Sequence, residues 1–219
     1  MASQRKIPRA HYLSAEKIMG IKLLFLDIGG VLLSDGWNHQ ARAEAAERFN
    51  LQLIQIEKDH AVAFPLFENG KITLDQYIDS VIFNEERNFS KAELKDFMFS
   101  KSTQLPDFLP WLIEWKKKHQ FKIFAINNEG KEFNDYRIKK FGLHQCFDAF
   151  ISSCEVGFSK PDPAIFKLAL GIAQEEANNC LYFDDRAIHV SMAKQLGINA
   201  HLHQNFTKTK EILESINKS

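Results

Sequence analysis

Polar side chains able to bind a cation or an anion follow several of the apolar runs in this sequence. Asp27 follows the first run, Asp184 and Asp185 follow a later one, and Asn127 and Lys160 lie after two others. Carboxylate oxygens suit Mg²⁺, which is commonly held by one or two carboxylates, waters and a substrate phosphate. A lysine opposite the metal would neutralise a phosphoryl oxygen. The residue types therefore predict a magnesium site at which a phosphorylated ligand binds.

The elements that must position these residues are short strands. Apolar runs typical of strands buried on both faces occur at 21–26, 121–126, 147–152, 180–183 and 198–203. Helical patterns alternate with them at 107–118, 131–141, 162–171, 188–196 and 207–216. Such alternation predicts an α/β fold with a doubly wound, Rossmann-like parallel sheet of about five strands. Ligands bind at the carboxyl ends of such strands, where the polar residues lie.

The segment from 36 to 102 has no good strand and reads as helical. Residues 37–53 have helix-forming composition, and capping-box patterns open helices at 73–83 and 90–99. We interpret 36–102 as an all-helical cap inserted after the first strand. The Rossmann-like core then comprises 19–35 and 103–219, and residues 1–18, with a possible helical turn near 14–19, form an N-terminal extension.

The overall composition excludes several classes of protein. The 28 basic residues balance the 28 acidic ones, so nothing indicates a nucleic-acid partner. No apolar run is long enough to span a membrane, and the N-terminus lacks the apolar segment of a secretory signal. Three irregularly spaced cysteines fit a reducing compartment. We expect a cytoplasmic protein without a membrane partner; the sequence gives no indication of the oligomeric state.

Four short segments resemble the motifs of the haloacid dehalogenase-like hydrolase superfamily. They occur in that family's order and are Asp27-Ile-Gly-Gly-Val31, Asn127, Lys160-Pro161 and Phe183-Asp-Asp185. The resemblance covers about residues 21–203. It implies a magnesium-dependent phosphatase that acts on a small phosphorylated metabolite through an aspartyl-phosphate intermediate.

The resemblance also implies a role for each matching residue. Asp27 would be the nucleophile and a metal ligand, and Lys160 would hold the phosphoryl group and Asp27 in place. The backbone carbonyl of Gly29 and the carboxylate of Asp184 would be further metal ligands, and Asp185 would act directly or through water. Asn127 and Gly30 would contact the phosphoryl group.

Residues Phe67–Gly70 resemble the loop that contacts substrate in capped members of the family. Glu68 and Asn69 are its candidate substrate-contacting residues. The same four residues could equally be an ordinary connection between two helices.

Two positions depart from the phosphatase pattern. Gly29 stands where most members have an acid that protonates the leaving group, and Ile126 stands where most have a hydroxyl residue. Losing a positioned acid–base group costs about 10²–10⁴ in rate, and losing one transition-state donor costs roughly 10²–10³. We therefore expect an enzyme that is slow or acts on a narrow range of substrates. Asp35 could replace the acid, although a turn residue of the flap is the simpler explanation.

The first motif also bears on the substrate. Asp27-Ile-Gly29 is similar to the first motif of a bacterial subgroup of the family that includes sugar-phosphate phosphatases acting on glucose 1-phosphate, and this similarity favours a sugar 1-phosphate. The acidic pair Asp184-Asp185 argues against the true dehalogenases, which work without metal.

Two other functions stay open. A catalytically impaired binding or regulatory protein is the main alternative, motivated by Gly29 and Ile126. A phosphotransferase is a weaker one. Four of the eight histidines, His39, His189, His201 and His203, lack metal-binding spacing with other ligands, and a structural role is predicted for His201 and His203.

Overall fold

The computed structural model describes residues 20–216, and its centre is a five-stranded, all-parallel sheet. The strand order is β3-β2-β1-β4-β5. The bounds are β1 (Leu23–Leu26), β2 (Lys122–Asn127), β3 (Ala149–Ser152), β4 (Cys180–Asp184) and β5 (Asn199–Leu202). From the central strand β1 the chain adds β2 and β3 on one side of the sheet and then β4 and β5 on the other. This confirms the predicted doubly wound α/β fold.

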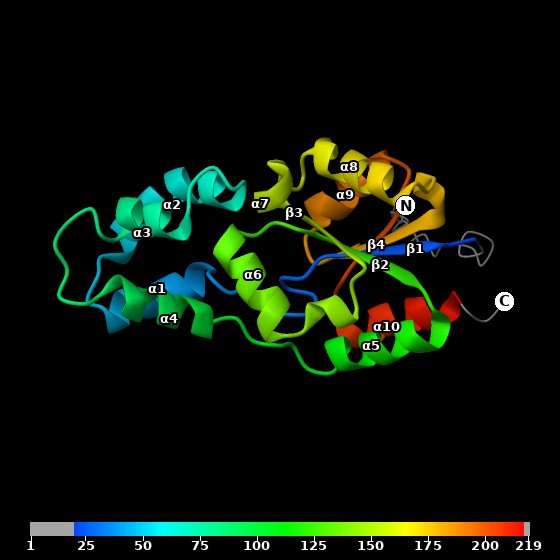
Figure 1. The fold of residues 1–219 in the computed structure, drawn as a ribbon, viewed down its shortest axis with the longest axis horizontal. Helices are drawn as coiled ribbons and strands as arrows, with labels where there is room; N and C mark the ends of the chain where they lie inside the picture. The colour runs from blue at the N-terminus through cyan, green and yellow to red at the C-terminus, as the bar shows by residue number, and fades with distance from the viewer. Residues whose placement is uncertain (1–19, 217–219) are drawn as a thin grey trace, which may run out of the picture.

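Side chains alternate between the two faces of the sheet and bury helices on both. Leu24 and Leu26 belong to an apolar cluster with α5 (Phe108–His119) and α10 (Phe206–Ser215). Leu23 and Phe25 belong to a second cluster with α8 (Pro163–Ala173) and α9 (Ala187–Gln195). Figure 1 shows these helix pairs on opposite sides of the strands. The remaining core helices are α6 (Lys131–Lys140), the short α7 (Ser153–Val156) and two single 3₁₀ turns, at Leu143–Gln145 and Ala177–Asn179.

Four helices between β1 and α5 pack around a separate apolar cluster. They are α1 (His39–Arg48), α2 (Leu53–Glu68), α3 (Leu74–Val81) and α4 (Lys91–Ser100), and we call them the lid. Both predicted capping boxes are present, on Thr73 and Ser90. The lid lies at the end of the molecule toward which the strands run (Figure 1). The exact division into extension, core and cap stays a prediction, and the helical turn expected near 14–19 lies outside the described residues.

Helix α2 has no counterpart among the helices predicted from the sequence, and the helix expected at 37–53 is α1, which ends at Arg48. Pro65 lies within it, near its C-terminal end. Ile54 and Val62 are 81% and 75% exposed, so its apolar residues do not form a single buried face. Phe67 and Glu68 close this helix, and Asn69 begins the turn that leaves it. Half of the expected substrate loop is therefore the last turn of a helix.

The guanidinium of Arg137 on α6 joins the two connections between sheet and lid. Its Nη2 donates to the backbone oxygen of Ser34 at 2.6 Å, and its Nε donates to Ser102 Oγ at 3.1 Å. Its Nη1 lies 2.8 Å from a carboxylate oxygen of Glu129, and both side chains are buried. The two lid connections are thus fixed to one another and to the core.

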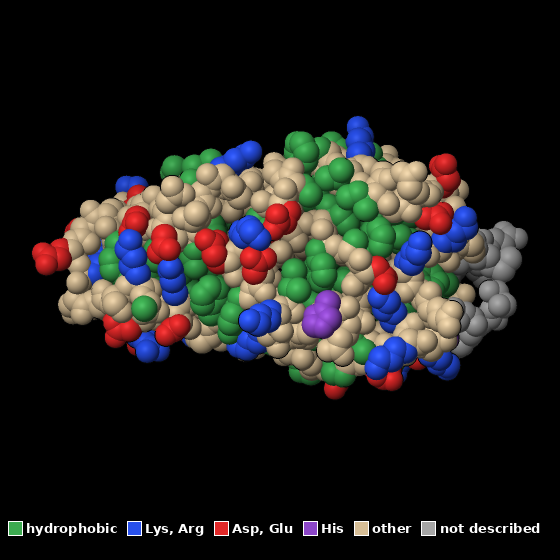
Figure 2. Space-filling view, viewed as in Figure 1, with side chains coloured by type: hydrophobic (Ala, Val, Ile, Leu, Met, Phe, Trp, Pro, Cys, Tyr) green, Lys and Arg blue, Asp and Glu red, His purple; other side chains and the backbone are tan. Residues whose placement is uncertain are grey.

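Acidic and basic side chains alternate over the face of the molecule in Figure 2, without a continuous area of one charge. This mixture agrees with the balanced composition. Among residues 20–216, no helix combines the length and apolar character needed to cross a membrane.

Candidate active site

Asp27 is the first residue after β1, and its carboxylate lies at the carboxyl edge of the sheet. Its backbone N–H donates to the Phe183 oxygen at 3.0 Å, which extends the pairing of β1 with β4. One carboxylate oxygen accepts from the Ile28 amide at 2.7 Å, and the other lies 2.9 Å from Lys160 Nζ. Burial raises the pKa of Asp27 to about 7; Lys160 opposes this shift, and the charge on Asp184 adds to it.

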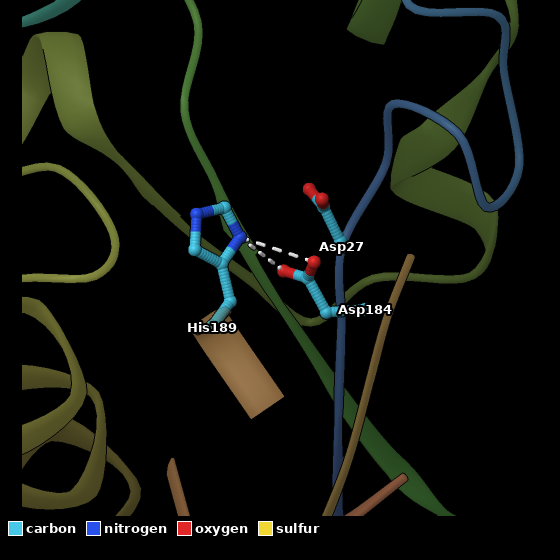
Figure 3. Close-up of side chains that lie close together, drawn as sticks. All are labelled: Asp27, Asp184 and His189. Atoms are coloured by element: carbon cyan, nitrogen blue, oxygen red, sulfur yellow. Dashed lines mark hydrogen bonds and ion pairs between the residues drawn. The ribbon is translucent and has the colours of Figure 1, made fainter. Parts of the chain in front are cut away.

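Asp184 ends the neighbouring strand β4, and its fully buried carboxylate is surrounded by donors. Lys160 Nζ lies 2.7 Å away, His189 Nδ1 3.0 Å, and the Tyr182 hydroxyl donates to the same oxygen as Lys160. The Arg186 amide donates to the other oxygen at 2.8 Å. Burial alone would raise the pKa of Asp184, but Lys160 and His189 outweigh it and hold the pKa below its usual range. Figure 3 shows Asp27, Asp184 and His189 converging from their separate elements.

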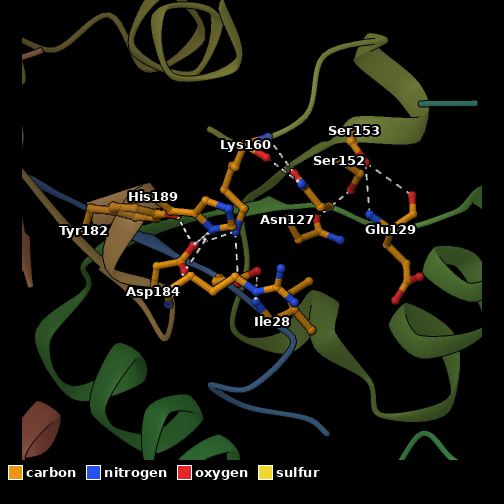
Figure 4. A network of polar contacts seen from close by, with 12 residues as sticks. Ile28, Asn127, Glu129, Ser152, Ser153, Lys160, Tyr182, Asp184 and His189 are labelled. Atoms are coloured by element: carbon orange, nitrogen blue, oxygen red, sulfur yellow. Dashed lines mark hydrogen bonds and ion pairs between the residues drawn. The ribbon is translucent and has the colours of Figure 1, made fainter. Parts of the chain in front are cut away.

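Lys160 bridges the two carboxylates. Its peptide bond to Pro161 is cis, and its backbone is held by Asn128, whose side chain accepts from Lys160 N at 2.8 Å and donates to Lys160 O at 2.9 Å. Burial would lower the pKa of Lys160, but Asp27 and Asp184 raise it, so the side chain is an ammonium. Figure 4 shows this network.

Asp185 differs from its neighbour because its carboxylate has no hydrogen bond or ion pair within residues 20–216. It is half-buried and lines the cavity described below. Burial raises its pKa, as do the charges of Asp184 and Asp35. Gly30 has φ +68°, and a Cβ there would overlap the Asp185 carboxylate. Glycine at position 30 therefore leaves room for Asp185.

A cavity of about 380 Å³ lies between this edge of the sheet and the lid. Its volume is within the range of small-molecule sites. Asp27, Gly29, Lys160 and Asp185 line it from the core. The lid and the two residues before α1 contribute six of the lining residues, which are Trp37, Asn38, Arg42, His60, Phe64 and Glu68.

The structure separates the predicted site residues into two groups. Asp27, Gly29, Lys160, Asp185 and Glu68 line the cavity. The others make contacts elsewhere: Asp184 lies behind Lys160, the Gly30 amide donates to the Leu33 oxygen, and the Asn69 amide group donates to the Pro65 oxygen. The Asn127 side chain accepts from Ser152 and donates to Asn134.

Most of the lid residues that line the cavity were not singled out as site residues from the sequence. Neither were Asn128, Glu129, Tyr182 and His189, which take part in the polar network of the site. Asn128 directly follows a predicted motif residue, and that adjacency was its only signal. His189 shows no metal-binding spacing in the sequence, yet the fold pairs its Nδ1 with Asp184.

The two departures from the phosphatase pattern have different consequences in the structure. Ile126 is fully buried in the apolar cluster beneath the sheet, so a hydroxyl there would not face the cavity. Gly29 does line the cavity. A Cβ at position 29 would lie 3.6 Å from Asp35 Oδ1 and 3.8 Å from Arg137 Nη1. The Asp35 carboxylate thus lies beside the place of the missing acid.

The donor chemistry of the cavity fits a hard divalent cation. One ligand atom each from Asp27, Asp184 and His189 lie within 4.8 Å of one another. His189 Nδ1 and the Asp184 oxygens are already paired, whereas Asp185, unpaired among residues 20–216, offers its carboxylate to the cavity that Asp27 and Gly29 also line. Carboxylate and carbonyl oxygens at one edge suit Mg²⁺.

A family model supports the same reading, since residues 21–197 match the model described as haloacid dehalogenase-like hydrolase. The chain belongs to this family. Bifunctional epoxide hydrolase 2 of Sus scrofa is 36% identical over 219 residues, covering 90% of this chain and 39% of that protein. The chain therefore spans about two fifths of the length of these relatives. Flavin mononucleotide hydrolase 1 of Arabidopsis thaliana is 25% identical over 186 residues, 84% of this chain and 73% of that protein.

Solved structures of the family share the fold. An enzyme of the haloacid dehalogenase-like family from Bacteroides thetaiotaomicron, bt-2542, crystallised with magnesium and inorganic phosphate, superimposes with a TM-score of 0.73. It is 23% identical, and the match covers 84% of this chain and 94% of that one. At this identity the likeness concerns the fold alone.

Proposed function

We propose that the protein is a magnesium-dependent phosphatase that hydrolyses a small phosphorylated metabolite through an aspartyl-phosphate on Asp27. The observation that carries this proposal is the position of Asp27. Its carboxylate lies at a strand end, on a cavity, against the Lys160 ammonium, with the unpaired Asp185 on the same cavity. An anionic nucleophile needs such positive charge when its target is an anion.

The reaction takes place in two displacements. A carboxylate oxygen of Asp27 bonds to phosphorus while the ester P–O bond breaks, and the leaving oxygen takes up a proton. Water then attacks the phosphorus of the aspartyl-phosphate and gives up a proton to the group that protonated the leaving oxygen, the P–O bond to Asp27 breaks, and inorganic phosphate leaves. Lys160 neutralises charge on the phosphoryl oxygens and keeps Asp27 oriented.

Mg²⁺ would be held by the Asp27 and Asp185 carboxylates and the Gly29 carbonyl, and when bound it neutralises phosphoryl charge as a Lewis acid. The Asp184 carboxylate, enclosed by Lys160, Tyr182 and His189, would orient Lys160 and support the metal ligands from behind.

The proton for the leaving group needs a donor, and Asp35 is our candidate. Its carboxylate lies beside the Gly29 position, and it lines the cavity. This geometry favours Asp35 over its earlier interpretation as a turn residue alone. A sugar phosphate fits the size of the cavity, and Flavin mononucleotide hydrolase 1 is named for another phosphate ester.

A regulatory protein that binds a phosphorylated ligand without turnover is the second candidate. Gly29 favours it, because no carboxylate stands at that position. Ile126 supports it less, since its side chain lies in the core.

Hydrolysis of a panel of phosphate esters, with and without Mg²⁺, tests the proposal. Asp27→Asn should lower kcat by at least about 10³-fold, because it removes the nucleophile. Asp96→Asn is the matched control, since Asp96 is exposed on α4. Phosphate release that is equal in wild type and Asp27→Asn would refute the mechanism.

A further inference from the structure

Four lysine and arginine side chains line the cavity between the sheet and the lid. Three of them, Lys160, Arg42 and Arg137, each make an ion pair with at least one carboxylate of the protein. The fourth is Arg186, which is exposed and whose guanidinium has no hydrogen bond or ion pair within residues 20–216. Among these four cations, Arg186 is therefore the one that remains available to a ligand.

The backbone of Arg186 is fixed at the carboxyl edge of the sheet. Arg186 directly follows Asp185 and is the N-cap residue of α9. Its backbone N–H donates to Asp184 Oδ1 at 2.8 Å, and that carboxylate is itself fully buried. The guanidinium therefore stays beside the cavity, although its own side chain is exposed to solvent.

The charge of Arg186 acts on both walls of the cavity. It lowers the pKa of Asp185 on the core side and the pKa of Glu68 on the lid side, without forming an ion pair with either carboxylate. Arg186 thus lies near the proposed metal ligand and also near the last turn of α2. When the phosphorus of an ester lies at Asp27, the leaving part of the substrate extends toward the lid and passes this guanidinium.

Glu68 does not neutralise Arg186. Burial and the charge of Glu129 raise the pKa of Glu68 to about 7, so its carboxyl is partly protonated at neutral pH. Its side chain lies 3.4 Å from Asn128 Nδ2, and its backbone oxygen accepts from Ser153 Oγ at 2.6 Å. A protonated carboxyl can donate a hydrogen bond to an anionic oxygen. The lid wall next to Arg186 therefore tolerates an anion.

The reacting phosphoryl group already has its own positive charge. Lys160 Nζ lies 2.9 Å from Asp27 and is 1% exposed, and Mg²⁺ at Asp27 and Asp185 would add to that charge when bound. Arg186 is instead exposed, on the path of the leaving part of the substrate. A guanidinium presents five N–H donors in a planar fork that matches a carboxylate or a phosphate. Arg186 is therefore suited to a second anion.

We infer that Arg186 binds a second anionic group, a carboxylate or a second phosphate, on the leaving part of the substrate. This inference deepens the proposed function and rests on it, since it assumes that the first phosphate binds at Asp27. Arg186 is a specificity-determining residue in this account. Phosphate esters of uncharged alcohols are the weaker ligands.

Calorimetry on Asp27→Asn in Mg²⁺ tests the inference without requiring turnover. The ligands are the phosphate esters of hydroxyacetic, 3-hydroxypropanoic and 4-hydroxybutanoic acids, each compared with the ester of the corresponding amide, which has the same shape and no charge there. At the length that reaches Arg186, the acid should bind roughly tenfold more tightly than the amide, as expected for a charge-assisted hydrogen bond that is partly solvated. Propane-1,3-diol bisphosphate against propyl phosphate tests a second phosphate in the same way, and the larger ratio identifies the preferred anion.

Variants of Arg186 assign the preference to this residue. Adding Arg186→Gln should reduce the acid-to-amide ratio of affinities to about one, whereas Arg186→Lys should retain part of it. Arg48→Gln is the matched control, because Arg48 is an exposed arginine of α1 away from the cavity lining. It should leave the ratio unchanged. Inorganic phosphate should bind to all of these variants with similar affinity, since it occupies only the site at Asp27.

The possible failures of the inference and of the proposed function can be told apart. Equal affinity for acid and amide at every length without a preference for the bisphosphate, or a ratio that persists in Arg186→Gln, would overturn the inference even if the wild type hydrolyses phosphate esters. A preference that is lost in Arg186→Gln, without hydrolysis by the wild type, would refute only the proposed turnover. Failure of inorganic phosphate and of every ester to bind would refute the phosphate site and the inference with it.

Discussion

The ammonium nitrogen of Lys160 lies 2.7 Å from the Asp184 carboxylate, and the two side chains are 1% and 0% exposed. The same nitrogen lies 2.9 Å from Asp27. The Lys160 ammonium is thus buried together with two carboxylates, and its charge offsets the repulsion between them. Breaking such a buried pair from one side leaves uncompensated charge.

We expect Lys160→Met to lower both stability and activity. The free energy of unfolding at pH 8 should fall by about 3–5 kcal/mol, because Asp27 and Asp184 then face each other without a cation. Phosphatase activity should fall by about 10²–10³-fold through loss of a phosphoryl-stabilising group. Urea unfolding and steady-state assays measure the two effects. Adding Asp184→Asn should restore part of the stability, and a double variant no more stable than the single one would contradict this account.

Restoring an acid at position 29 should raise activity. A Cβ at Gly29 would make only ordinary contacts, at 3.6 Å from Asp35 and 3.8 Å from Arg137, so Gly29→Asp can be accommodated. We expect kcat to rise by about tenfold or more, part of the 10²–10⁴ that a positioned acid supplies. Gly29→Asn, which lacks the proton, is the control. An equal gain in both variants would show that the effect is not acid catalysis.

The proposed role of Asp35 can be tested in the wild-type sequence and in Gly29→Asp. Asp35→Asn should lower kcat about 10²-fold in the wild-type sequence, where Asp35 is the nearest acid to the Gly29 position. In Gly29→Asp the same substitution should matter much less, because the new acid takes over. Identical losses in both backgrounds would assign Asp35 to structure alone.

The sheet could be predicted because its signals are local. The runs at Leu23–Leu26 and Cys180–Asp184 are buried on both faces and therefore almost wholly apolar. The capping boxes on Thr73 and Ser90 depend on residues three positions apart and were likewise visible. Since the carboxyl ends of parallel strands meet at one edge, the sequence could also predict that Asp27 and Lys160 converge.

Other features of the site could not be predicted, because they depend on contacts between residues that are far apart in the sequence. Arg137 and Ser34 are 103 positions apart, and nothing near either residue indicates the bond. Asp184 and Asp185 are chemically alike, and the different roles proposed for them depend on what surrounds each carboxylate. Tyr77 could be read as an apolar residue of a helix, yet its hydroxyl connects two other lid residues.

Metal affinity should depend on glycine at position 30. A Cβ at Gly30 would displace the Asp185 carboxylate, so Gly30→Ala should raise the Mg²⁺ concentration for half-maximal activity by about 10–100-fold. Removing metal with EDTA should abolish activity in wild type and variant alike. Gly171→Ala is the control, because a Cβ there meets no atom within 4 Å. Unchanged Mg²⁺ dependence in Gly30→Ala would exclude Asp185 as a ligand.

Arg137 should be required for the attachment of the lid. Arg137→Met leaves buried Glu129 without its ion-pair partner and frees the connections at Ser34 and Ser102. We expect a loss of about 3–5 kcal/mol in unfolding free energy and faster proteolysis within both connections. Glu129→Gln should cost less, since the amide oxygen can still accept from Arg137. Lys118→Met, on the exposed side of α5, is the surface control.

The buried, neutral His60 should make the lid sensitive to acid. Its pKa is about 4 in the folded protein and 6.5 in the unfolded chain, so the unfolded state binds more protons between these values. Stability that is present above pH 6.5 is therefore lost as the pH falls toward 4. Between pH 7 and pH 5 we expect this residue to account for about 1 kcal/mol, allowing for partial solvation of the ring. His60→Phe should reduce the difference in unfolding free energy between the two pH values by that amount, whereas His144→Phe, at an exposed position of the core, should retain it. Parallel declines in wild type and His60→Phe would mean that His60 titrates normally in the folded protein, with Glu57 cancelling the effects of burial and of Arg42.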